Sequence, residues 1–116
     1  MKKKFLLLFI FLALAIGTAV FLLPKESNAN LDSFAQCLSS KGAVMYGAYW
    51  CSHCQNEKNA FGESFKFVNY VECTERPNEC LAKGVQGYPT WIFPDDQRFV
   101  GEQGITKLQE ISGCPL

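Results

Sequence analysis

The chain carries, at residues 43–54, the stretch AVMYGAYWCSHC, in which a mostly apolar run precedes two cysteines separated by two residues. A polar, helix-compatible stretch follows at residues 55–61. This order predicts a buried strand, a tight turn and a helix that begins at Cys51. A thiol at a helix N-terminus lies near unpaired backbone N–H groups and the positive end of the helix dipole, which favour the thiolate. Because the thiolate is the nucleophile of disulfide exchange, we predict redox chemistry at Cys51.

Length and composition narrow the class of protein. The 116 residues leave room for one small domain and a short appendage. From residue 30 onward the chain has ten acidic and seven basic side chains and no basic stripe, which argues against nucleic acid as a partner. Six cysteines, all beyond residue 36, are many for so small a domain. An even number in a short exported chain predicts an oxidising compartment with structural disulfides.

The N-terminal segment predicts export. Three lysines at residues 2–4 precede residues 5–23, an uncharged apolar run. As a helix this run would be ~28 Å long, close to the ~30 Å hydrocarbon core of a bilayer, and the lysines would keep the N-terminus in the cytoplasm. We therefore predict that residues 1–24 form a signal anchor, a hydrophobic helix that crosses the cell membrane once.

A cleaved signal peptide is the alternative that stays open. Ser27 and Ala29 offer small residues for a cleavage site after Ala29, which would leave the domain secreted or periplasmic. Residues 25–30 are predicted to form a polar linker, and residues 31–116 the domain. Both alternatives place the domain on the extracytoplasmic side of the membrane.

Periodic apolar residues predict alternating helices and strands after the linker. The expected elements are a helix over residues 31–38, a strand over 43–49, a helix after Cys51, a strand over 65–73, a short helix over 79–83, a turn and strand over 87–93, a return strand over 98–102 and a helix over 105–112. A β-α-β unit followed by a hairpin and a helix is an α/β arrangement. We therefore expect a central mixed four-stranded sheet flanked by helices.

Two motifs make the chain resemble the thioredoxin family. The first is Tyr49-Trp50-Cys51-Ser52-His53-Cys54, and the second, Gly87-Tyr88-Pro89-Thr90, begins 33 residues after the first one ends. In that family the proline of the second motif is cis and lies against the active-site disulfide, so the resemblance implies a thioredoxin fold and the same role for Pro89. Cys51 is the candidate nucleophile and Cys54 the resolving thiol. The residues expected at the substrate groove are Trp50, Tyr88, Pro89 and Thr90.

A narrower resemblance concerns the thioredoxin-like domain fused to bacterial and plant homologues of vitamin K epoxide reductase. The similar stretches are residues 42–54, 61–62, 69–73 and 87–91. In that family the domain passes oxidising equivalents from a membrane quinone reductase to exported proteins. No multi-span membrane domain is present in this sequence. The resemblance therefore implies a separate reductase chain of that kind as partner, and exported proteins with cysteines as substrates.

Two departures from the thioredoxin pattern bear on the direction of electron flow. Met45 stands where cytoplasmic thioredoxins carry a buried Asp that aids proton transfer, and Ser52-His53 replaces their Gly-Pro. His53, if protonated, would stabilise the Cys51 thiolate and make the disulfide more oxidising. We therefore expect a catalyst of disulfide formation. Two alternatives stay open: a membrane-tethered reductase or isomerase fed by a transmembrane electron donor, and a non-catalytic binding module.

The other four cysteines are expected to be structural. Cys73 and Cys80 flank a six-residue loop and are predicted to form a local disulfide, with a second redox pair as the alternative. Cys37 and Cys114 either pair or stay as buried thiols, and we favour pairing because exported chains tend not to keep free thiols. No metal or other cofactor is predicted. A c-type haem site is excluded because the residue after the second motif cysteine is not His.

Overall fold

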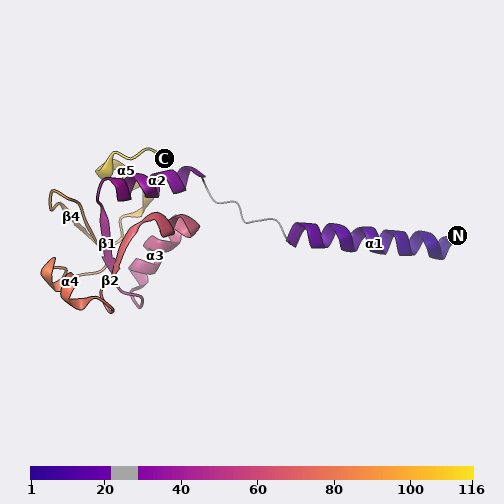
Figure 1. Ribbon diagram of the computed structural model, residues 1–116, viewed down its shortest axis with the longest axis horizontal. Helices are drawn as coiled ribbons and strands as arrows, with labels where there is room; N and C mark the ends of the chain where they lie inside the picture. The colour runs from indigo at the N-terminus through magenta and orange to yellow at the C-terminus, as the bar shows by residue number, and fades with distance from the viewer. Residues whose placement is uncertain (22–28) are drawn as a thin grey trace.

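A four-stranded sheet lies at the centre of the domain (Figure 1). Its strands are in the order β2-β1-β3-β4. The strands are β1 (Val44–Gly47), β2 (Asn69–Glu72), β3 (Thr90–Ile92) and β4 (Arg98–Val100). β1 runs parallel to β2 and antiparallel to β3, which in turn pairs antiparallel with β4. This mixed sheet confirms the predicted α/β arrangement.

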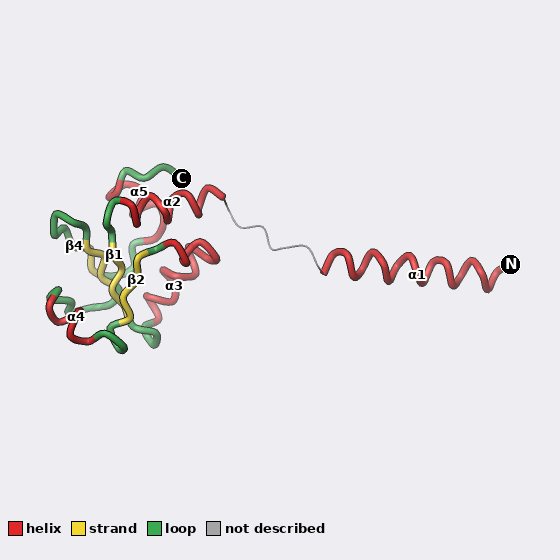
Figure 2. The backbone as a smooth tube through the Cα atoms, viewed as in Figure 1, coloured by secondary structure: helices red, strands yellow, loops and turns green. Residues whose placement is uncertain are grey.

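The computed structural model describes residues 1–21 and 29–116. Its helices are α1 (Lys2–Phe21), α2 (Ala29–Ser40), α3 (Ser52–Phe61), α4 (Pro77–Ala82) and α5 (Gly104–Ser112), with a 3₁₀ helix, η1 (Gly62–Phe67), directly after α3. Figure 2 shows α2, α3, α4 and α5 around the strands of the sheet. The expected N-terminal helix is therefore present, and each predicted strand is found in a shorter form.

Alternating side chains divide the core into two clusters. Met45 and Trp91, paired across β1 and β3, lie in one cluster with residues of α2, α3 and α5 such as Leu38. Tyr46 and Ile92, the next residues along each strand, lie in the other cluster beside α4. Because successive side chains of a strand point to opposite faces, both faces of the sheet are buried.

Residues 65–67 differ from their prediction as the start of a strand. They belong to the 3₁₀ helix η1, and β2 begins only at Asn69. In an extended strand Ser64 and Phe65 would point to opposite faces. The helical winding instead lets Ser64 donate a hydrogen bond to the carboxylate of Asp32 at 2.6 Å while the Phe65 ring meets the Tyr70 ring at 5.6 Å. Tertiary contacts therefore override the alternating pattern.

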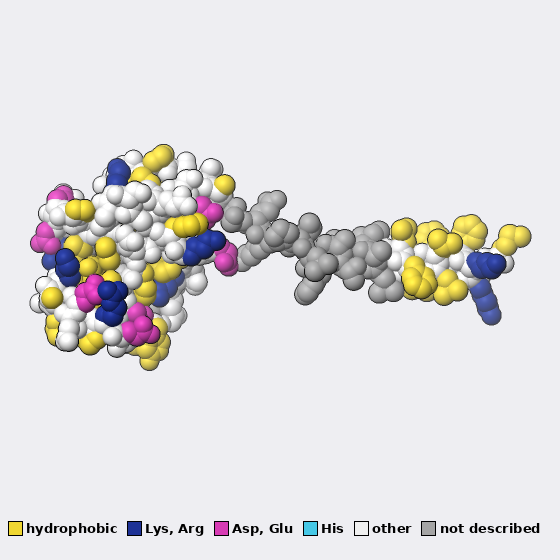
Figure 3. Space-filling view, viewed as in Figure 1, with side chains coloured by type: hydrophobic (Ala, Val, Ile, Leu, Met, Phe, Trp, Pro, Cys, Tyr) yellow, Lys and Arg dark blue, Asp and Glu magenta, His cyan; other side chains and the backbone are white. Residues whose placement is uncertain are grey.

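The N-terminal helix α1 exposes apolar side chains along its described surface (Figure 3). Among residues 1–21 and 29–116, no helix has the length and apolar character needed to cross a membrane. The membrane span predicted over residues 5–23 is thus not supported by the described residues. Residues 22–28, which hold most of the predicted linker and part of the predicted cleavage site, lie outside them.

Candidate active site

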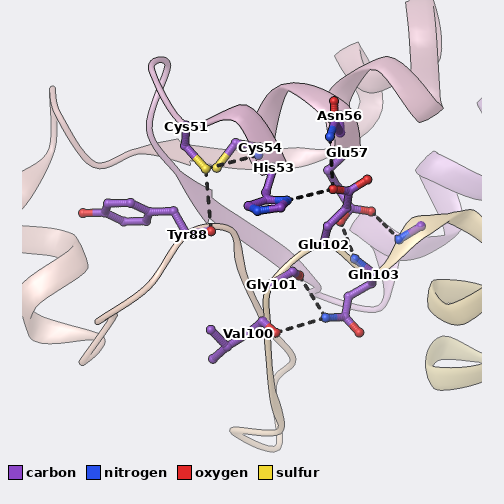
Figure 4. Close-up of polar contacts among 11 residues, drawn as sticks. Cys51, His53, Cys54, Asn56, Glu57, Tyr88, Val100, Gly101, Glu102 and Gln103 are labelled. Atoms are coloured by element: carbon purple, nitrogen blue, oxygen red, sulfur yellow. Dashed lines mark hydrogen bonds and ion pairs between the residues drawn. The ribbon is translucent and has the colours of Figure 1, made fainter.

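Cys51 lies between the end of β1 and the first turn of α3, and it is the N-cap residue of that helix. Its Sγ accepts a hydrogen bond from the backbone N–H of Cys54 at 3.2 Å (Figure 4). The thiol also donates to the carbonyl oxygen of Tyr88 at 3.6 Å. Both the N-cap bond and the helix dipole favour negative charge on this sulfur.

Cys54 lies on the inner side of the first turn of α3. Its side chain has no exposed surface, whereas Cys51 keeps 7% of its surface exposed. Both are free thiols, so the structure shows the reduced pair. Burial, together with a hydrogen bond to Cys51, raises the pKa of Cys54 to about 12. The pair is therefore asymmetric: Cys51 can reach the sulfur of another molecule, and Cys54 can act only from inside, on Cys51.

A groove of about 460 Å³ opens beside the first cysteine. Trp50 lines it with 62% of its surface exposed, and its ring meets the Tyr88 ring edge-on at 5.9 Å. Pro89, which follows a cis peptide bond, and Thr90 are buried behind the groove rather than lining it. Two residues outside the predicted set, Gln86 and Gly87, complete the lining together with Cys51, Ser52 and His53.

His53 interacts with Glu102 and not with the sulfur of Cys51. Its Nδ1 lies 3.1 Å from Oε2 of Glu102, and Figure 4 shows the ring turned toward that carboxylate. Asn56, one turn later in α3, donates to the same oxygen at 3.3 Å. The hydrogen bond from His53, and then that from Asn56, lowers the pKa of Glu102. The structure thus adds Glu102, a residue that the sequence analysis did not identify, to the surroundings of the motif.

Glu57 is a second acidic residue that the sequence analysis missed. Its side chain is fully buried in α3, and its two oxygens accept hydrogen bonds from the backbone N–H groups of Gln103 at 2.6 Å and Gly104 at 2.9 Å. The carboxylate therefore fixes the start of α5 against the helix that carries the cysteines. Burial raises the pKa of Glu57 above its ordinary value, although these two hydrogen bonds act against the rise.

Glu57→Gln is expected to remove a pH dependence from the free energy of unfolding. Because the pKa of Glu57 is raised in the folded protein, the folded state binds this proton more tightly than the unfolded state does. The stabilisation is fully present below the ordinary glutamate pKa and is lost as pH rises through the raised value. Urea unfolding across this range should show wild-type stability falling with pH and a flatter profile for the variant.

Glu75→Gln is the matched control for this measurement, because Glu75 is exposed on the loop after β2. Its profile should follow that of the wild type. Equal slopes for the wild type and the Glu57 variant would contradict the role given to the buried carboxyl.

The other four cysteines form two disulfides in the structure. One joins Cys37 in α2 to Cys114 near the C-terminus, over a sequence separation of 77 residues. The other joins Cys73 to Cys80, over a separation of 7 residues. In the described part of the chain, no group of three or more metal-binding side chains comes together.

Comparison with known proteins gives the same fold and chemistry. The sequence profile of the Thioredoxin family matches residues 25–113. "Thiol-disulfide oxidoreductase LTO1" of Arabidopsis thaliana is 41% identical over 103 residues, which cover 81% of this chain and 27% of that protein. "Thioredoxin domain-containing protein 5 homolog" of Drosophila melanogaster is 27% identical over 109 residues, which cover 79% of this chain and 26% of that protein. The chain thus spans about a quarter of the length of these relatives.

Among solved structures, the thioredoxin of Fasciola hepatica aligns with 26% identity and a TM-score of 0.49, covering 61% of this chain and 76% of the other. The match of the family profile to most of the chain agrees with the mixed sheet and with a cysteine pair at the start of α3. The chain therefore belongs to the thioredoxin family of thiol–disulfide oxidoreductases.

Proposed function

We propose that this protein promotes disulfide formation in exported proteins, on the extracytoplasmic side of the membrane, through the Cys51–Cys54 pair. The observation that carries the proposal is the position of Cys51 at the N-cap of α3, where its sulfur accepts the N–H of Cys54. A sulfur stabilised as a thiolate is a good leaving group, and a stabilised reduced form makes the disulfide a stronger oxidant.

Location outside the cytoplasm is supported by the remaining cysteines. Two further disulfides hold the domain together, so four of its six cysteines are oxidised. Structural disulfides persist in oxidising compartments and are rare where glutathione and thioredoxin keep thiols reduced. The lysines and apolar run at the N-terminus support the same location. Anchoring by residues 5–23 and cleavage near Ala29 stay predictions.

The oxidising direction is supported by what lies beneath the pair. Met45, fully buried in the core cluster that contains both cysteines, provides no acid–base group at the position of the thioredoxin Asp. The motifs shared with domains fused to vitamin K epoxide reductase homologues support a membrane quinone reductase, on a separate chain, as the partner that reoxidises the pair. The relative named as a thiol-disulfide oxidoreductase supports the class of reaction.

The redox equilibrium of Cys51–Cys54 against glutathione tests the direction. A catalyst of disulfide formation is expected to have a potential of about −120 to −180 mV, whereas a value near −270 mV, as in thioredoxin, would contradict the proposal. The potential is measured by quenching the mixtures with an alkylating reagent and separating the reduced and oxidised forms. The state of the pair in cells is the second readout, because a pair held mostly reduced would indicate a reductase or isomerase.

A further inference from the structure

The buried thiol of Cys54 must exchange a proton in every catalytic cycle. When the Cys51–Cys54 bond breaks, Cys54 leaves as a thiolate and takes up a proton, and the thiol loses this proton when the bond forms again. With its pKa raised to about 12, the sulfur holds the proton at neutral pH. Its side chain has no exposed surface, so water cannot deliver or remove the proton directly. The site therefore needs a neighbouring group that moves the proton.

Tyr70 on β2 lies where such a group is needed. Gly47, the last residue of β1, has no side chain. A Cβ placed on it would lie 3.0 Å from Sγ of Cys54 and 3.2 Å from the hydroxyl oxygen of Tyr70. The sulfur and the phenol oxygen therefore border the same small space, which this glycine leaves open.

Glu72 continues the path from Tyr70 toward solvent. The Tyr70 hydroxyl donates to Oε2 of Glu72 at 2.6 Å. The other carboxylate oxygen accepts the backbone N–H of Tyr49 at 3.1 Å and the hydroxyl of Thr74 at 2.7 Å, which fixes its orientation. Partial burial acts to raise the pKa of Glu72, but the hydrogen bonds from Tyr70 and Thr74 lower it overall. Glu72 is therefore a carboxylate at neutral pH, and its partial exposure connects it with water.

The remaining groups around the sulfur do not provide this path. Lys58 lies with its ammonium 3.9 Å from the centroid of the Tyr70 ring and stabilises a thiolate at Cys54 by charge. Glu57 is bonded to the backbone of α5, and the thioether of Met45 carries no exchangeable proton. Burial, followed by the hydrogen bond to Glu72, raises the pKa of Tyr70 above its ordinary value. Tyr70 therefore stays a neutral phenol, which passes one proton on as it receives another.

We propose that Tyr70 and Glu72 form a proton relay between the buried sulfur of Cys54 and water. The relay rests on the proposed exchange through Cys51–Cys54, but it works in either direction of electron flow.

In the oxidising direction a substrate thiolate attacks Sγ of Cys51, a new disulfide forms between them, and the Cys51–Cys54 bond breaks. Cys54 leaves with the electron pair and takes the proton of the Tyr70 hydroxyl, which is replaced by a proton from water through Glu72. A second substrate thiolate then attacks the substrate sulfur and releases Cys51 as a thiolate, so the substrate is oxidised and the pair reduced. Reoxidation moves the Cys54 proton out along the same path.

Tyr70→Phe tests the relay because it removes only the hydroxyl. With the full chain in its disulfide form and a dithiol peptide as substrate, the opening of Cys51–Cys54 at pH 7 is expected to slow by about 100-fold, the lower end for general acid–base catalysis. The equilibrium constant against glutathione is expected to stay unchanged, because a relay alters rates and not end states. The pH profile of the opening rate should also change, because the Tyr70 hydroxyl no longer supplies a proton to Cys54.

Tyr46→Phe is the matched control, since Tyr46 is a buried tyrosine of β1 that lies in the other core cluster. Its rate and pH profile should match those of the wild type. An unchanged rate in Tyr70→Phe would overturn the relay, as would a rate loss fully explained by a shifted equilibrium constant.

If the Tyr70 variant does not fold, Glu72→Gln keeps the phenol and decides the question. In this variant we expect Cys51–Cys54 to open more slowly, with an unchanged equilibrium constant against glutathione. Opening at the wild-type rate would overturn the relay. A redox potential of the wild-type protein in the thioredoxin range would contradict the proposed role in disulfide formation but not the relay. The relay predicts slower exchange in Tyr70→Phe whether the pair works as an oxidant or as a reductant.

Discussion

Cys51→Ser is expected to reduce thiol–disulfide exchange to the uncatalysed background. Cys51 is the member of the motif pair that keeps exposed surface, and its sulfur receives the N-cap hydrogen bond. A serine hydroxyl cannot form a disulfide. The remaining thiol, Cys54, has no exposed surface and a pKa raised to about 12, so it can neither reach a substrate nor ionise at neutral pH. Oxidation of a dithiol peptide, followed by chromatography, measures the loss.

Cys54→Ala separates the two halves of this reaction. Cys51 is still present in that variant, so attack on a disulfide peptide should proceed and stop at a mixed disulfide through Cys51, visible by mass spectrometry. The double variant Cys73→Ala/Cys80→Ala is the control, because it lacks the local disulfide and should retain exchange. Activity in Cys51→Ser, or no trapped intermediate in Cys54→Ala, would contradict the assigned roles and favour a binding module.

The double variant Cys37→Ala/Cys114→Ala is expected to lose about 4.5 kcal/mol of stability by the loop-entropy relation. The relation applies to the sequence separation of 77 residues that this disulfide closes. The free energy of unfolding of a typical domain is only about 5–15 kcal/mol. The variant, with its other cysteines oxidised, should therefore unfold at a much lower urea concentration than the wild type. Replacing both partners avoids a new free thiol.

The disulfide between Cys73 and Cys80 provides the comparison. It closes a separation of only 7 residues, and the same relation gives about 2.4 kcal/mol. Urea unfolding of the two double variants should therefore rank the long-range disulfide as the more stabilising. The reverse order would show that strain or residual structure in the unfolded chain outweighs loop entropy here.

The sequence was most informative where local signals were strong. An apolar run followed by two cysteines at a helix start predicted the first strand, the turn and α3. These elements could be predicted because they depend on interactions between residues that are neighbours in the sequence. Residues 65–67 were misassigned as the start of a strand because the alternation of Phe65 and Phe67 fits a strand, while Ser64 and Phe65 both find partners through a helical turn. A local pattern cannot report contacts with α2.

The acidic residues around the site show the same limit. Glu102 is 49 positions from His53, and they meet only because the loop after β4 returns to α3. The parallel pairing of β1 with β2 brings Glu72 opposite Gly47 and places the Tyr70 hydroxyl at the space that Gly47 leaves beside Cys54. Glu57 had a usable signal, since an acid three positions after Cys54 lies on the same helix face as a buried cysteine.

The bond between Cys37 and Cys114 also makes the domain a covalent ring. Every residue of the sheet and of α3 to α5 lies between its two cysteines in the sequence, as does the exposed hairpin turn at residues 94–97. A protease that cuts one peptide bond in that turn would open the ring but release no fragment, and the two pieces would stay side by side with their strands available for pairing. Separation would require a second cut or a reductant, so a single nick leaves one molecule.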